Sequence, residues 1–296
     1  MSPRGREKLS ISQLQALEAV ARTGSFTQAA RQLGIAQPSV SNHVQALETR
    51  YKTRLFTKTG YTAEPTPALQ RLLPRIRALL ALAADLEADL SRRGALGAGE
   101  LRIGYSTYQL AIPLISRFMT RYPELRIEAR AAASQDLMDL LEEGDLDLAF
   151  VTAREAPTGY HAVPLAHTRI VVVVPASHEM AARQTLTWAE LAALPLIQRE
   201  TSSGTRRIFE AAARLQRITP KTILALGSWG SIATLILAGN GFGIAMAAEI
   251  EADPRFRGLL IEDPNLALSH FAVCAPDMTR VAAISAFLSS LEGAPL

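Results

Sequence analysis

Cysteine is almost absent from this chain, which holds Cys274 as its single thiol among 296 residues. One cysteine cannot form an internal disulfide, so the fold depends on apolar cores, and the length suffices for two or three domains. Long apolar runs are absent too, since no segment reaches about 18 uninterrupted apolar residues. The opening segment MSPRGREKLSISQLQAL lacks the apolar stretch and cleavage site of a secretory signal. We therefore expect a cytoplasmic protein that does not enter a membrane.

Acidic residues are scarce in the first third of the chain. Residues 1–93 hold 14 Lys and Arg against 7 Asp and Glu, whereas residues 94–296 hold 17 against 21. Basic side chains neutralise phosphates, and this neutralisation drives affinity for nucleic acid. The asymmetry favours a polyanion-binding module joined to a body with another task, although an unevenly charged solvated surface would give the same counts.

Two short helices with tight turns are predicted near the start. Apolar residues at helical spacing predict a first helix that ends at Gly24, and Ser25 is placed to cap the next helix. The second helix ends at Gly34, whose backbone freedom suits a tight turn. We expect Ile35 to fill the core beneath that turn.

A third helix opens at Gln37-Pro38-Ser39, because proline is tolerated in a first turn. At about 100° per residue its apolar positions share one face. The opposite face and its flanks present hydroxyl and amide groups suited to phosphates and base edges, which predicts DNA contacts; these residues are Pro38, Ser39, Ser41, Asn42, Gln45 and Thr49. A neutral solvated surface is the plainer alternative.

A basic flank and a predicted hairpin favour the DNA-binding interpretation. The flank consists of Arg50, Lys52, Arg54 and Lys58. The segment LFTKTGYTAEPTP then alternates around a turn at Gly60, which predicts a β-hairpin beside the third helix. We assign residues 1–66 to a winged helix-turn-helix domain.

Residues 67–93 form a separate unit with a broad apolar stripe, composed of Leu69, Leu72, Leu73, Ile76, Leu79, Leu80, Ala83, Leu86 and Leu90. Packing against the same helix of a second subunit would cover this stripe and present two reading heads to two half-sites. A core helix of the neighbouring domain is the alternative. Pro74 lies inside the pattern and should kink or divide the helix.

From residue 94 to the end, short apolar strands alternate with helical segments, as in LRIGYS, QLAIPLISRFMTRY and RIEARAA. This alternation predicts parallel α/β units, and two small lobes are the simplest packing. The predicted fold class is therefore α/β. A winged helix-turn-helix domain of the all-α type and a long linker helix precede the two lobes in the chain.

Hydroxyl-rich loops follow several predicted strands. Ligands of open α/β sheets sit beyond the carboxyl ends of strands, where backbone N–H groups at helix N-termini hold anions. We predict effector contacts from Ser106, Thr107, Tyr108, Ser134, Thr152, Thr201, Ser202, Ser203, Thr205, Arg206, Ser228 and Trp229. Simple helix capping is the competing role for each Ser and Thr.

No catalytic or metal-binding pattern emerges. The five histidines show no metal-ligand spacing, and GSWGS is not the Gly-x-Ser-x-Gly nucleophile motif. GNGFG also fails as a dinucleotide motif, because Ile244 occupies the place of its last glycine. We expect no metal, no cofactor and no enzymatic activity.

The sequence resembles the LysR-type transcriptional regulators in LEAVARTGSFTQAARQLGIAQPSVSNHVQALETRYKTRLF, in SGTR and in AGNGFGIAM. The resemblance implies DNA contacts from Gln37, Ser39, Asn42, His43 and Lys58, although Glu64-Pro65-Thr66-Pro67 departs from the usual wing. It also implies a linker-helix homodimer, a homotetramer and a small-molecule effector. The two lobes should resemble periplasmic binding proteins, with chain crossovers near 163–168 and 263–270.

Finer resemblance points to the effector. VSNHVQALETRYKTRLF, PLIQRETSSGTRRIFEAA and ADPRF look like the subgroup associated with aminoethylphosphonate catabolism, whereas GYSTYQLAIP departs from it. We expect a carboxylate, phosphate or phosphonate effector held within residues 94–296, between lobe I (98–165 and 267–296) and lobe II (166–266). A solute-binding protein and an α/β enzyme acting on a small acid remain the rivals from other classes.

Overall fold

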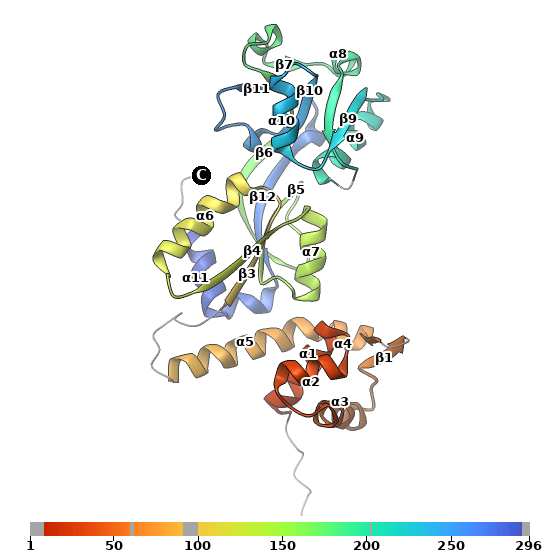
Figure 1. Ribbon diagram of the computed structural model, residues 1–296, viewed down its shortest axis with the longest axis vertical. Helices are drawn as coiled ribbons and strands as arrows, with labels where there is room; N and C mark the ends of the chain where they lie inside the picture. The colour runs from red at the N-terminus through yellow and green to blue at the C-terminus, as the bar shows by residue number, and fades with distance from the viewer. Residues whose placement is uncertain (1–8, 60–61, 91–99, 202, 292–296) are drawn as a thin grey trace, which may run out of the picture.

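The structure is a computed structural model that describes residues 9–59, 62–90, 100–201 and 203–291. It places a helical head at the bottom, a long helix above the head, and two α/β lobes stacked on that helix (Figure 1). The sequence places three glycines at positions 94, 97 and 99, which predict a hinge between the linker and the lobes, and these positions lie outside the described residues.

The head contains three helices and a hairpin, with bounds α1 Ile11–Thr23, α2 Phe26–Leu33, α3 Gln37–Tyr51, β1 Phe56–Thr59 and β2 Thr62–Pro65. The predicted stop and start signals are confirmed: Gly24 and Gly34 adopt left-handed φ values of 63° and 66° at the helix ends, and the Ser25 side chain accepts a hydrogen bond from Gln28 N. The prediction for Ile35 is wrong, because its side chain is 41% exposed. The core beneath the turn is already filled by smaller residues such as Ala29 and Ala30.

The linker is divided into α4 (Pro67–Gln70) and α5 (Leu73–Leu90), as a proline at position 74 predicts. The apolar side chains of the linker do not form one continuous exposed surface. Leu69, Leu73 and Ile76 are buried in the core of the head, and Ala78 is buried in the core of lobe I. Leu72, Leu79 and Leu86 are 45%, 51% and 60% exposed.

Polar contacts fasten α5 to its neighbours. Asp85 accepts a hydrogen bond at 2.8 Å from Ala282 N, at the start of the last helix of lobe I. Arg77 donates to the Glu142 carbonyl oxygen at 3.2 Å and lies 3.9 Å from the Glu18 carboxylate of the head. Burial is the largest cause of a lowered pKa at Arg77. One arginine therefore bridges head and lobe I.

Lobe I is built on a sheet whose neighbouring strands run in the order β4, β3, β5, β12 (Ala267–Cys274) and β6 (His161–Pro175). Its element bounds are β3 Glu100–Tyr105, α6 Tyr108–Arg121, β4 Arg126–Ala131, α7 Ser134–Glu143, β5 Leu148–Ala153, η4 Pro276–Arg280 and α11 Ala282–Leu291. β3 pairs in parallel with β4 and β5, whereas β12 is antiparallel to β5. The α6 and α11 helices cover one face, with Phe118 and Phe287 in contact, and α7 covers the other.

Lobe II continues the order through β6, β10, β8 and β9. Its bounds are η1 Glu179–Ala182, β7 Thr185–Leu186, α8 Trp188–Ala193, β8 Leu196–Arg199, α9 Gly204–Leu215, β9 Thr222–Leu226, α10 Trp229–Leu237, β10 Phe242–Met246, η2 Ala247–Glu249, β11 Phe256–Ile261 and η3 Pro264–Leu266. The run Ile170–Val174 is fully buried between two apolar clusters, one under α9 and one under α10.

Two long strands connect the lobes. β6 (His161–Pro175) begins in the sheet of lobe I and ends in that of lobe II, and β12 (Ala267–Cys274) runs antiparallel to its first part. The expected crossovers between the lobes are therefore hydrogen-bonded strands. The first part of β6, HAVPLAHT, lacks a continuous apolar run, so the periodicity of the sequence did not predict a strand there. Its extended conformation is stabilised by pairing with β12.

Candidate DNA-reading helix and effector cleft

One face of α3, the third helix, packs against the rest of the head. Val40, Val44 and Leu47 are at most 3% exposed and pack into the core of the head. No side chain caps the first turn of α3, which Ala36 precedes. Pro38 has no N–H and the Ser39 N–H donates to the Ala36 carbonyl oxygen at 2.9 Å, so the Gln37 N–H is the group of that turn that suits a phosphate oxygen.

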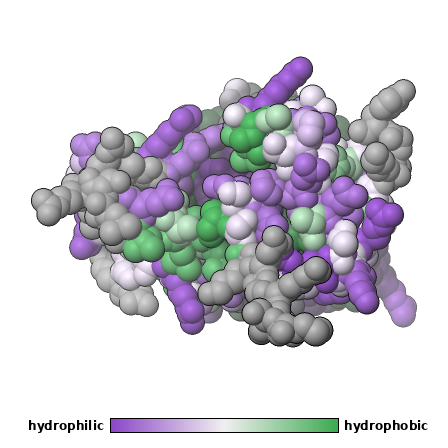
Figure 2. Space-filling model, turned by 90° about the horizontal axis from the view of Figure 1, so that it is seen from below, coloured by the Kyte–Doolittle hydropathy of each residue, from purple (hydrophilic) through white to green (hydrophobic). Residues whose placement is uncertain are grey.

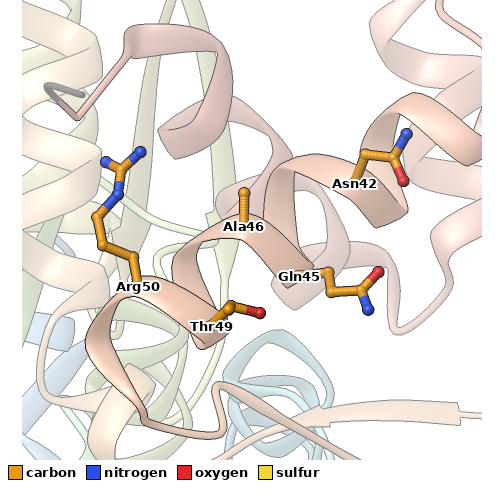
Figure 3. A pocket seen from close by; sticks show the side chains of 5 residues that line it. All are labelled: Asn42, Gln45, Ala46, Thr49 and Arg50. Carbon is orange, nitrogen blue, oxygen red and sulfur yellow. The ribbon is translucent and has the colours of Figure 1, made fainter. Parts of the chain in front are cut away.

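The opposite face of α3 is open. Asn42, Gln45, Ala46, Thr49 and Arg50 line a hollow of about 420 Å³ on this face. Their side chains stand away from the helix axis, and the two amides are spread along it (Figure 3). Amides in this position would be able to reach base edges in a groove of DNA.

The remaining predicted DNA contacts lie on the same helix or beside it. Gln37, Pro38, Asn42 and Gln45 are exposed, and Ser39, Ser41 and His43 are half-buried. Gln37 donates to Ser41 Oγ at 2.8 Å, which ties these two side chains together. The Arg54 side chain is 84% exposed. Lys58 belongs to β1, but its side chain lies outside the described residues.

One residue of this region had no predicted role. Glu48 accepts hydrogen bonds from the backbone N–H groups of Leu55 and Phe56 at 2.8 and 3.3 Å, and it lies 3.6 Å from Arg54. It thereby fixes the start of the hairpin against α3. The sequence contained one signal for this role, because Glu48 is an acidic residue within a basic stretch.

In lobe I, three predicted effector residues converge at the carboxyl ends of the strands. Ser106 Oγ lies 3.4 Å from Thr152 Oγ1, and Ser134 Oγ accepts a hydrogen bond from Thr152 N at 3.0 Å. Thr152 Oγ1 also lies 2.8 Å from His270 Nδ1. The sequence did not single out His270 for a role, because its contact comes from a strand more than a hundred residues away.

The first turn of α6 directly follows Ser106. Thr107 is 4% exposed and precedes α6 without making a side-chain cap, whereas Tyr108 is 55% exposed. The free N–H groups of this turn are suited to an anion.

The predicted residues of lobe II are more dispersed. Ser228 caps α10 by accepting from Ser231 N, and Trp229 packs against Phe256 with ring centroids 5.8 Å apart. Ser203 and Thr205 are 6% and 7% exposed at the start of α9. Thr201 is exposed, and Ser202 lies outside the described residues.

Arg206, predicted to face an anion, already has partners. Its Nε lies 2.7 Å from Glu210 Oε1, and its Nη1 donates to the Arg199 carbonyl oxygen. Within the described part of the chain, no hydrogen bond joins the loops of residues 201–206 and 228–229 to Ser106, Ser134 and Thr152, which we call the Ser106 cluster. Other groups connect the lobes: Gln109 Nε2 donates to the Glu249 carbonyl oxygen at 3.2 Å.

The described residues contain no group of three or more His, Cys, Asp or Glu side chains placed to hold a metal ion. The same part of the chain contains no helix with the length and hydropathy needed to cross a membrane.

Comparison with known protein families decides the assignment. The family described as "Bacterial regulatory helix-turn-helix protein, lysR family" matches residues 11–68. The family described as "LysR substrate binding domain" matches residues 94–294, which is more than half of the chain. The chain belongs to the LysR family of DNA-binding transcriptional regulators.

Curated relatives of this LysR-family regulator carry matching names. The HTH-type transcriptional regulator CbbR of Rhodospirillum rubrum is 30% identical over 79% of this chain and 78% of its own length. The regulator YnfL of Escherichia coli is 28% identical over 81% and 83%, respectively.

Solved structures support the fold of this LysR-family chain. Full-length OxyR of Pseudomonas aeruginosa superposes with a TM-score of 0.72 at 17% identity, covering 97% of this chain and 96% of OxyR. The regulator CbnR, solved in complex with its target DNA, superposes with a TM-score of 0.54 at 21% identity, covering 96% and 99%. At these identities the likeness concerns the fold.

Proposed function

We propose that this LysR-family regulator binds promoter DNA through α3 and that a small anion held between its two lobes controls this binding or the resulting activation. In this proposal residues 1–66 read DNA, residues 67–93 dimerise and residues 94–296 bind the effector. The observation that carries it is the open face of α3, where two amides and a hydroxyl stand clear of a fully buried apolar face.

Dimerisation through α5 is supported by its exposed leucines. Leu79 and Leu86 are seven residues apart, so they lie close to one line along α5, and the exposed Leu72 directly precedes the helix. Seen from below, separate apolar areas lie among hydrophilic ones (Figure 2). A second α5 packed along Leu79 and Leu86 would remove these leucines from water, and pairs of such dimers would form the homotetramer.

The effector class is inferred from the groups at the strand ends. Hydroxyls of the Ser106 cluster and the free first turns of α6 and α9 offer hydrogen-bond donors to an anion. A carboxylate, phosphate or phosphonate fits these donors, and the sequence likeness makes 2-aminoethylphosphonate the first candidate. The proposed function involves no catalytic turnover, no metal ion and no cofactor. Because the protein would bind promoter DNA of the chromosome, we also propose that it acts in the cytoplasm.

The DNA proposal is tested with the full-length chain and a duplex selected by it from a random-sequence library. Asn42→Ala should weaken binding to the selected duplex by about 1–3 kcal/mol, because one side chain that contacts base edges is lost. Binding of the wild type should weaken steeply as salt rises. Gel-shift titrations at several salt concentrations measure both effects.

Asn240→Ala provides the matched control, because it removes an exposed amide from lobe II. It should bind the selected duplex like the wild type. The proposal fails if full-length protein selects no duplex at low salt, or if Asn42→Ala discriminates among sequences as the wild type does.

A further inference from the structure

A second hollow lies at the junction of the lobes, apart from the predicted effector loops. This groove of about 1400 Å³ is walled by α6, the crossover part of β6, the segment from η2 to β11, and the start of β12. None of the predicted effector residues lines it. The groove is therefore a separate place where a ligand would contact both lobes at once.

Four side chains that line the groove carry unsatisfied buried atoms. Gln109 Oε1, Thr168 Oγ1, Arg169 Nε and His270 Nε2 have no hydrogen-bond partner among the described residues. Thr168 is 9% exposed and His270 is 1% exposed. Leaving a buried polar group unsatisfied costs about 1–3 kcal/mol, so a cluster of four at one groove indicates a polar occupant.

The charge of the lining favours an anion. Arg117, Arg169 and Arg257 line the groove, against the carboxylates of Glu251 and Asp253. The Asp253 carboxylate is already occupied by the Arg255 guanidinium, with two contacts of 2.9 and 2.7 Å. The lining thus holds three arginines and one carboxylate that is not engaged in this way, although Arg257 Nη1 also donates to the Phe256 carbonyl oxygen at 2.9 Å.

Gln109 adds a second requirement. Its amide nitrogen donates to the Glu249 carbonyl oxygen, which fixes the orientation of the amide and leaves Oε1 as an acceptor. An occupant that satisfies Oε1 must therefore carry a hydrogen-bond donor of its own.

We propose that this groove is a second ligand site, which binds a small carboxylate that also bears a hydroxyl group. Its carboxylates pair with Arg169 and the neighbouring arginines, and its hydroxyl donates to Gln109 Oε1. The site does not depend on the identity of the ligand in the predicted effector cleft.

His270 connects the two places. His270 lines the groove, its Nε2 has no partner among the described residues, and its Nδ1 lies 2.8 Å from Thr152 Oγ1, which is 3.4 Å from Ser106 Oγ. An occupant that hydrogen-bonds to Nε2 selects the tautomer of the ring. It thereby sets whether the Thr152 hydroxyl donates or accepts at the Ser106 cluster, so the groove ligand influences the cleft.

The test uses full-length protein and two probes that differ in one group. Citrate has three carboxylates and a hydroxyl, and tricarballylate has the same carboxylates without the hydroxyl. Calorimetric titration should show that the wild type binds citrate more tightly than tricarballylate. Arg169→Gln should weaken citrate binding by about tenfold or more, because a charged hydrogen bond is lost. Gln109→Leu should abolish the preference for citrate.

Two controls locate the effect. Arg183→Gln removes one positive charge from an exposed pair with Glu190, and Thr205→Val alters the predicted effector cleft. Both should bind citrate like the wild type. A loss of citrate binding in Thr205→Val with no change in Arg169→Gln would place the probe in the cleft and overturn the groove site.

The remaining outcomes also decide the proposal. It is overturned if neither probe binds the wild type, or if Arg169→Gln binds citrate unchanged. It is equally overturned if Arg169→Gln changes the oligomeric state in sedimentation velocity without changing citrate affinity, because the groove would then be covered by a second copy of the chain. DNA binding of the wild type does not enter this test.

Discussion

At the scale of single residues, His270 has the most unusual environment of the histidines. It lies on β12, where the pairing with β6 shifts register between His270 and Phe271. Burial lowers the pKa of His270 to about 4, so the ring is neutral near pH 7. A neutral ring accepts or donates at either nitrogen according to its tautomer, which suits a position between two ligand sites.

The low pKa of His270 predicts a pH dependence of stability. The unfolded chain takes up a proton near pH 6.5 and the native chain near pH 4, so stability should fall as the pH decreases between these values. The loss amounts to about 3 kcal/mol. His270→Leu should flatten this part of the profile in urea unfolding at a series of pH values.

The exposed His161 supplies a control for this measurement. His161→Leu should leave the profile between pH 6.5 and pH 4 close to that of the wild type. An unchanged slope in His270→Leu would show that His270 does not cause the pH dependence.

At the scale of elements, α5 has three different surroundings along its length. Its first turn completes the core of the head, its middle is fastened to lobe I, and a line of leucines remains exposed. Asp85 receives the first N–H of α11, so the helix also caps a helix of another domain. A rearrangement of lobe I would therefore be transmitted directly to α5.

The exposed leucines predict how the subunits associate. Leu79→Asp should weaken the homodimer by about tenfold or more, because a buried leucine contributes about 2 kcal/mol and a charge would replace it in the interface. Ala84→Asp adds the same charge to an exposed position away from the leucine line. Sedimentation equilibrium should show dissociation of the first variant only. Equal association of both would remove α5 as the dimer contact.

At the scale of the whole molecule, two lobes meet at a pair of strands and a few direct contacts. Gln109 reaches the Glu249 carbonyl, and Arg154 donates to the Asn265 carbonyl oxygen at 3.0 Å. The pKa of the Glu249 carboxyl is raised, and burial is the largest cause of this shift. Few contacts would have to change for the lobes to move, so a ligand with different affinities for two arrangements would shift their balance.

The effector cleft predicts a separation of two functions. Thr205→Val should weaken binding of 2-aminoethylphosphonate by about tenfold, because a hydroxyl donor near an anion is lost, while DNA affinity stays unchanged. Calorimetry and gel shifts measure the two affinities. Thr120→Val, on the exposed side of α6, is the control. Titrations of Thr205→Val that match the wild type would exclude this role, and absence of binding to the wild type would exclude the phosphonate.

Local signals predicted the head well. The Gly24-Ser25 pair and the Gly34 turn set the ends of α1 and α2, and the apolar spacing of α3 set its buried face. These features depend on a few neighbouring residues, which is why they are visible in the sequence. Ile35 was placed wrongly because hydrophobicity alone does not show whether a core is already full.

The candidate sites were predicted less completely than the fold. Ser106 and Ser134 both contact Thr152, because carboxyl ends of parallel strands gather at one edge, and their contact with an effector stays a prediction. Trp229 and Arg206 instead find partners within lobe II. Sequence position near a strand end does not reveal which side chain turns toward the cleft.

The sequence by itself determined the family, the winged helix-turn-helix head, the α/β alternation and the division of the linker near Pro74, because each follows from local spacing and turn chemistry. Only the tertiary structure decided the pairing of β6 with β12, the division of the α5 stripe between three surroundings, and the meeting of His270, Thr168 and Gln109 at one groove. Those features join segments that are far apart in the sequence, and local patterns carry no information about which distant segments will pack together.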